Sequence, residues 1–173
     1  MSLVIHQATL KDLDFIMSLI TNGARKGHFS KDVLSDKAYV RKNIHSIVCK
    51  QISDKGNRSE AWIAKENNRK IGAVIMRYRH VGDVELEFIA VDKSFKTKGF
   101  GSMILDHILS TYLELHSLVA LCFEESSHLK HMLIKRGFEV VGQVSGGDVL
   151  THPKRIRSLM DKQFAPSYML PIS

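Results

Sequence analysis

The stretch from Val91 to Met103 combines glycines and cations at a spacing suited to binding an anion. It reads Val-Asp-Lys-Ser-Phe-Lys-Thr-Lys-Gly-Phe-Gly-Ser-Met, and it joins a strand-like run to an amphipathic helical run. Gly99 and Gly101 allow the backbone to approach a ligand closely, and the helix that follows begins with N–H groups that have no intrahelical partner. Lys93, Lys96 and Lys98 add positive charge. A pyrophosphate is the ligand that this turn predicts.

Two familiar phosphate-binding motifs do not fit the turn. A P-loop closes with Gly-Lys-Ser/Thr, whereas Ser102 and Met103 follow Gly101 here. A dinucleotide-binding fingerprint needs a third glycine at position 104, which is Ile104. The plainer alternative is that the Gly-x-Gly turn only connects a strand to a helix.

Hydrophobic periodicity predicts a mixed α/β order of elements around the turn. Strands are expected at 3–7, 61–65, 70–79, 84–91, 118–123 and 138–144, the second to fourth of them as an antiparallel meander. Thr9, with Asp12 at the capping-box position, opens a first helix, and a second lies within 33–49. A third helix follows the glycine turn, and a fourth is capped by Ser126 or Ser127 and ends at Gly137.

Length and composition favour one domain with a core of its own. The chain has 173 residues, of which 44% are hydrophobic, and it contains no apolar run long enough to cross a membrane. Neither a membrane partner nor a signal peptide is expected. Cys49 and Cys122 form no disulfide framework and no metal-binding spacing, which suits a cytoplasmic protein.

The positive charge is spread along the chain. The formal net charge is +7, without a long basic run and with little aromatic interleaving for base stacking. An anionic cofactor or a soluble surface therefore explains the charge better than a nucleic-acid partner does.

Two motifs and the order of elements resemble one enzyme superfamily. Lys96-Thr97-Lys98-Gly99-Phe100-Gly101 resembles the Gln/Arg-x-x-Gly-x-Gly/Ala pyrophosphate loop of the GNAT superfamily of acyl-CoA N-acyltransferases, with Lys96 at the Gln or Arg position. Leu133 to Phe138 resembles the family's Tyr-x-x-x-Gly-Phe, although Leu133 replaces the tyrosine. The resemblance implies an α/β (α+β) fold: a mixed, mostly antiparallel sheet with helices on both faces and one splayed strand pair.

The same resemblance implies acetyl-CoA as co-substrate, bound where the fourth and fifth strands splay apart. The walls of this gap are expected at 88–91 and 121–124, where pantetheine can pair with an exposed strand edge. The expected cofactor-binding residues are Ile89, Ala90, Val91, Lys96, Thr97, Lys98, Gly99, Phe100, Gly101, Ser102 and Ser126.

Acyl transfer to an amine requires a base and an acid. Glu85 and Glu87 lie two apart on one strand face and are the expected base; the alternative is that they only pair with Arg77 or Arg79 on the neighbouring strand. With Leu133 at the tyrosine position, Tyr168 is the candidate acid.

Ser126, Ser127, His128 and His131 lie near the same helix start and are further candidates for the acid, and water is another. His128 and His131 have the i, i+3 spacing of metal ligands but lack a third ligand, so no metal is expected.

An amine acceptor is expected to approach from the loop at 23–30. His28 and Phe29 are its most distinctive residues, and they either shape an amine pocket or seal the helix ends. Residues 151–166 are expected as a helical insertion, and 167–172 as the last strand of a single domain spanning 1–173.

These observations predict an N-acetyltransferase, a monomer or homodimer, that moves an acetyl group directly from acetyl-CoA to a primary amine of a small molecule or peptide. The alternative is an acyl-CoA-binding module on the same scaffold that has lost turnover.

Overall fold

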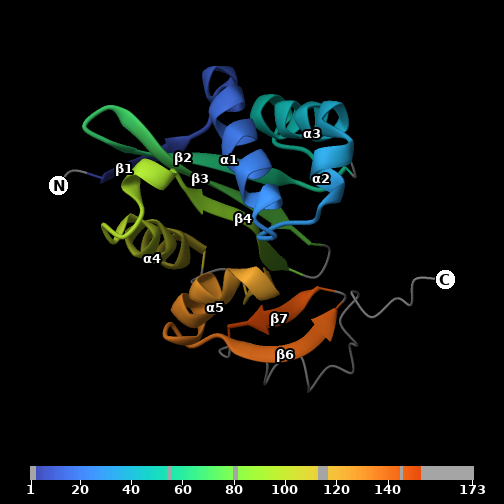
Figure 1. The fold of residues 1–173 in the computed structure, drawn as a ribbon, viewed down its shortest axis with the longest axis vertical. Helices are drawn as coiled ribbons and strands as arrows, with labels where there is room; N and C mark the ends of the chain where they lie inside the picture. The colour runs from blue at the N-terminus through green and yellow to red at the C-terminus, as the bar shows by residue number, and fades with distance from the viewer. Residues whose placement is uncertain (1–2, 54–55, 80–81, 113–116, 145, 153–173) are drawn as a thin grey trace.

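The computed structural model describes residues 3–53, 56–79, 82–112, 117–144 and 146–152 (Figure 1). Its strands are β1 (Leu3–Gln7), β2 (Ser59–Glu66), β3 (Arg69–Tyr78), β4 (Asp83–Val91), β5 (Ser117–Phe123), β6 (Glu139–Val144) and β7 (Gly147–Thr151). Its α-helices are α1 (Leu13–Arg25), α2 (Asp32–Ser35), α3 (Lys37–Lys50), α4 (Phe100–Tyr112) and α5 (Ser127–Ile134). Short 3-10 helices are η1 (Leu10–Asp12), η2 (Lys93–Phe95) and η3 (Glu124–Ser126). The strands form one sheet in the order β1-β2-β3-β4-β5-β7-β6.

The expected meander and splayed strand pair are both present. β1 to β4 pair antiparallel in sequence order. Asn67 and Asn68 form the β2–β3 turn with φ of 48° and 63°, as a type I′ turn requires. β4 and β5 run parallel, and their pairing ends at Leu86 and Ala120. Beyond that step the two strands pair only with their outer neighbours, β3 and β7.

Helices cover both faces of the sheet, as predicted. On one face α1 and α3 bury Ile16 and Ile47 against the sheet residues Ile63 and Ile75. On the other face α4 packs Ile104 and its neighbours against alternate residues of the same strands, and α5 contributes Leu133 (Figure 1). Because side chains alternate across a strand, β3 supplies both cores at once.

The predicted capping residues open the first helical segment. The Thr9 N–H and hydroxyl donate to Asp12 at 2.8 and 2.9 Å, and Lys70 forms an ion pair with Asp12 at 2.7 Å. Burial acts to raise the pKa of Asp12, but the hydrogen bonds from Lys70 and Thr9 outweigh it, so the pKa lies below its usual value. Thr9 starts η1, and α1 follows directly.

Two elements differ from the expectations. The helix expected within 33–49 is divided into α2 and α3, because Asp36 leaves helical geometry (φ −131°, ψ 68°) and its carboxylate caps the Tyr39 N–H of α3. β7 was not predicted, and Thr151, the expected start of the helical insertion, is its last residue. The rest of that insertion and the last strand lie outside the described residues.

β7 lies between β5 and β6 and is antiparallel to both. A Cβ at Gly147 would lie 2.4 Å from the Cys122 carbonyl oxygen, so only glycine allows this approach of the two backbones. Five residues beside a Gly-Gly pair carry too little periodicity to be recognised as a strand.

Candidate functional site

The divergence of β4 from β5 coincides with a β-bulge. Ile75 pairs with Phe88 and the next residue of β3, Met76, pairs with Leu86, so β4 is one residue longer here, at Glu87. A bulge bends a strand and increases its twist. Its position at the last paired step, Leu86 with Ala120, gives β4 a local reason to turn away from β5.

The glycine turn lies immediately beyond β4 and leads into α4. Thr97 and Gly99 have φ of 64° and 80°, and a Cβ on Gly99 would meet nothing within 4 Å. Met103 N–H donates to Gly99 C=O at 3.1 Å, so the N–H groups of Gly101 and Ser102 precede the first α-helical hydrogen bond of α4. This open, donor-rich helix start fits an anionic group such as pyrophosphate.

The side chains of the turn have different roles. Phe100 is fully buried and packs edge-on against Phe95, with ring centroids 6.1 Å apart, so its side chain anchors the turn to the core. Only the backbone of Phe100 is available to a ligand. Lys98 lies over the Phe95 ring at 5.5 Å and keeps its charge beside the turn.

Arg136, which the sequence did not single out, links the turn to the end of α5. Its guanidinium donates to both Asp106 oxygens at 2.6 and 3.0 Å, to the Met132 carbonyl at 3.0 Å, and to the Ser102 hydroxyl oxygen. The hydrogen bond from Arg136 holds the pKa of Asp106 below its usual value. An arginine just before Gly137-Phe138 is normally read as a helix-end cation, and nothing local indicates that it reaches α4.

Both candidate base residues are paired with arginines at the end of β3, Arg77 within the strand and Arg79 directly after it. Glu85 accepts from Arg79 Nη2 at 2.7 Å and from its Nε at 3.0 Å. Glu87 accepts from Arg77 Nη2, and from its Nε at 3.2 Å; Arg77 also lies 3.8 Å from Glu85. Because one arginine reaches both carboxylates, they share a face as predicted. The arginine pairing weighed as the alternative is present, and the base role stays a prediction.

The loop between α1 and α2 contacts β4 and the short helix η3 that follows β5. Phe29 stacks on Phe88 of β4, with centroids 4.8 Å apart, and lies so close to Gly23 that a Cβ there would be 2.2 Å from the ring. His28 Nδ1 lies 3.3 Å from Ser126 Oγ. His28 is expected at the acceptor and Ser126 at the cofactor, and the two side chains are in contact although 98 positions separate them in sequence.

This packing predicts an acid-sensitive contact at His28. Burial, followed by repulsion from Lys96 and Lys26, lowers the pKa of His28. Below about pH 6.5 the unfolded chain therefore takes up a proton that the folded chain resists, and stability falls as the pH falls. We expect the urea midpoint to drop less between pH 7.5 and 5.0 in His28→Gln than in the wild type. His45→Gln, at an exposed position of α3, serves as control, and equal drops in all three proteins would contradict the prediction.

The remaining acid candidates lie on α5 or outside the described residues. Leu133, at the family's tyrosine position, is 0% exposed inside the α4 core. Tyr168 lies outside the described residues. Ser127, His128 and His131 all belong to α5.

Among the described residues no group of three or more His, Cys, Asp or Glu side chains is placed to hold a metal ion, and no helix there has the length and apolar character to span a membrane.

Comparisons with known proteins place the chain. A family model, the Acetyltransferase (GNAT) family, matches residues 29–138. The search of curated proteins found no match. Among solved structures, PaiA N-acetyltransferase from Thermoplasma acidophilum in complex with coenzyme A is 12% identical, with a TM-score of 0.70 over 87% of this chain and 98% of that chain.

Two further structures give the same result. An acetyltransferase from Thermus thermophilus is 14% identical, with a TM-score of 0.66 over 87% of this chain and 96% of its own. Spermidine N-acetyltransferase from Vibrio cholerae, in complex with CoA and spermine, is 21% identical, with a TM-score of 0.59 over 86% and 92%. These likenesses show a shared fold, and the family match covers more than half of the sequence. With its mostly antiparallel seven-stranded sheet and splayed β4–β5 pair, the chain belongs to the GNAT acetyltransferase family.

Proposed function

We propose that this protein transfers an acetyl group from acetyl-CoA directly to a primary amine of a small molecule or peptide. The observation that carries the proposal is the open start of α4 at Gly99 to Ser102, directly beyond the point where β4 leaves β5. Coenzyme A would use both features, because its pyrophosphate accepts hydrogen bonds from several N–H groups and its pantetheine amides can pair with an exposed strand edge.

The residues that would hold the co-substrate lie along β4 and the turn. Backbone groups of Ile89, Ala90 and Val91 lie on the part of β4 that β5 no longer pairs. Lys96, Thr97, Lys98, Gly99, Phe100, Gly101 and Ser102 follow as the proposed pyrophosphate-binding turn, and Ser126, the last residue of η3 after β5, is proposed to complete the site. When bound, acetyl-CoA supplies an activated acyl group on a thiolate leaving group.

Glu85 and Glu87 are proposed to accept the proton of the incoming ammonium, directly or through water. Each would exchange an arginine hydrogen bond for one to the amine or water. The net charge of +7 disfavours a polycationic acceptor by repulsion, which favours small monoamines, amino acids or peptide amines over an acceptor such as the spermine of the Vibrio enzyme. His28 and Phe29 would border this acceptor through the α1–α2 loop.

Release of free thiol from acetyl-CoA, measured over a panel of amines, tests the proposal. With the best acceptor we expect Glu85→Gln or Glu87→Gln to lower kcat about 100-fold or more, the scale of general-base catalysis, with little change in coenzyme A affinity. Glu139→Gln, an exposed carboxylate on β6, is the control. Saturable coenzyme A binding without turnover on any amine would favour the alternative, a cofactor-binding module.

Arg136 offers a separate test of the binding turn. Because its guanidinium donates to Ser102 Oγ, the Ser102 hydroxyl proton is directed away and can be donated to a pyrophosphate oxygen. We expect Arg136→Met to weaken coenzyme A binding about tenfold, the size of one charge-assisted hydrogen bond. In a Ser102→Ala background the same change should have little further effect; full additivity would show that Arg136 does not act through Ser102 and would contradict the prediction. Calorimetric titration of the four proteins completes this cycle.

A further inference from the structure

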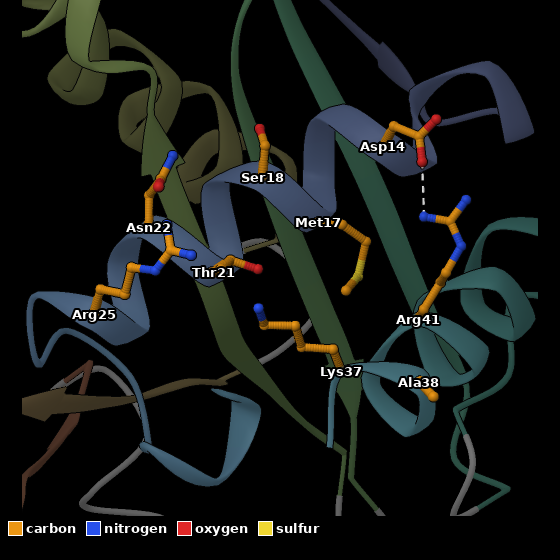
Figure 2. A pocket seen from close by; sticks show the side chains of 9 residues that line it. All are labelled: Asp14, Met17, Ser18, Thr21, Asn22, Arg25, Lys37, Ala38 and Arg41. Carbon is orange, nitrogen blue, oxygen red and sulfur yellow. Dashed lines mark hydrogen bonds and ion pairs between the residues drawn. The ribbon is translucent and has the colours of Figure 1, made fainter. Parts of the chain in front are cut away.

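A basic groove lies between α1 and α3 (Figure 2). It is a shallow hollow of about 510 Å³ that is widely open to solvent. Figure 2 shows Lys37 of α3 extending toward Thr21 of α1, Met17 pointing into the groove, and Arg41 turned toward Asp14.

The groove lies along the flank of α1 that faces α3. Asp14, Met17, Thr21 and Arg25 follow each other at helical spacing on one stripe of the helix. At 100° per residue the middle of this stripe lies about a quarter-turn from Ile16, Ile20 and Ala24, which are buried toward the sheet. None of the residues that line the groove belongs to β4, β5 or the turn before α4, and α4 packs on the other face of the sheet from α1 and α3, so the groove and the turn are separate places on the molecule.

The charges in the groove are only partly compensated. Arg41 Nη1 forms an ion pair with Asp14 at 2.7 Å. Neither Arg25 nor Lys37 takes part in an ion pair with any residue that the structure describes. Lys37 is also the first residue of α3, whose N-terminus is already capped by the Asp36 carboxylate. Two cations without an ion-pair partner among the described residues therefore share one hollow with the Thr21 hydroxyl.

We propose that this groove binds a small organic anion. Its phosphate or carboxylate group would lie between Arg25 and Lys37 and accept a hydrogen bond from Thr21, while its apolar body would contact Met17 and Ala38. Because both cations are exposed, binding will weaken as salt rises. The site does not depend on the transferase function proposed above.

Titration of the isotope-labelled full chain by NMR tests the site with three probes: phenyl phosphate, inorganic phosphate and phenol. We expect saturable shifts of the Thr21 and Ala38 amides with phenyl phosphate, weaker binding of inorganic phosphate, and none of phenol. The double variant Arg25→Gln/Lys37→Gln should raise the Kd of phenyl phosphate at least tenfold. Lys31→Gln/Lys42→Gln removes the same charge from exposed positions outside the groove lining and should change the Kd less than twofold.

The same titration in Gly99→Glu protein separates this site from the turn before α4. Groove shifts that persist in that variant support a second site. Shifts confined to residues 96–102, an equal loss in both double variants, or no saturation by phenyl phosphate at low salt would overturn the proposal.

Discussion

Gly99→Glu is expected to abolish measurable coenzyme A binding, raising the Kd at least 100-fold, or about 2.7 kcal/mol. The glutamate would place bulk and negative charge in the open space beside Gly99, where pyrophosphate is proposed to bind. It would also strain the backbone, because φ at Gly99 is 80°. Calorimetric titration of coenzyme A into the purified proteins measures the effect.

Gly56→Glu provides a closely matched control. Gly56 has φ of 75°, and a Cβ there would also meet nothing within 4 Å, so the variant carries the same strain and the same charge. It lies in the connection before β2, away from the turn. Wild-type affinity in Gly56→Glu, combined with lost affinity in Gly99→Glu, would assign the effect to the turn. Unchanged affinity in Gly99→Glu would place the pyrophosphate elsewhere.

Glu60→Ala is expected to have the largest effect on stability. The buried Glu60 carboxylate on β2 accepts from Tyr112 Oη at 2.5 Å, Arg58 Nη2 at 2.7 Å and Tyr78 Oη at 3.2 Å. Trp62 Nε1 donates in turn to Tyr112 at 3.1 Å. Alanine would leave these donors without their acceptor and open a cavity, at a cost of about 3 kcal/mol.

Thermal and urea unfolding measure this cost, which corresponds to a fall in Tm of roughly 10 °C for a chain of this size. Glu139→Ala, an exposed carboxylate, should change the free energy of unfolding by less than about 0.5 kcal/mol. Tyr112→Phe, which removes one donor and keeps the ring, should cost about 1 kcal/mol. A Glu60→Ala protein as stable as the Glu139 control would show that the network contributes nothing.

The buried Tyr112 hydroxyl is expected to make the protein less stable at alkaline pH. Burial, followed by the hydrogen bond to Glu60, raises its pKa. An acid with a raised pKa in the folded state contributes fully to stability below the unfolded pKa of about 10. This contribution is lost as the pH rises further, because the unfolded chain then gives up a proton that the folded chain keeps. Glu60→Ala should reduce this alkaline sensitivity, because one cause of the raised pKa is removed.

Sequence patterns predicted most of the elements and the glycine turn before α4, but neither β7 nor the break between α2 and α3. Strand alternation, the Asn67-Asn68 turn and the Thr9–Asp12 cap act between residues close in sequence, so each element follows from its own segment. The Gly-x-Gly turn after a strand is equally local. The order of the elements then indicated the topology of one family, and the observed sheet has the mostly antiparallel arrangement expected for it.

Contacts between distant residues needed the folded chain. The place of β7 between β5 and β6, the bulge at Glu87, the Arg136–Ser102 contact and the His28–Ser126 contact have no local signal. Each depends on how packed elements bring together residues far apart in sequence. Burial at such contacts also shifts pKa values, as it lowers the pKa of His28. The glycine turn is thus recognisable from neighbouring residues, whereas its surroundings arise from packing between layers.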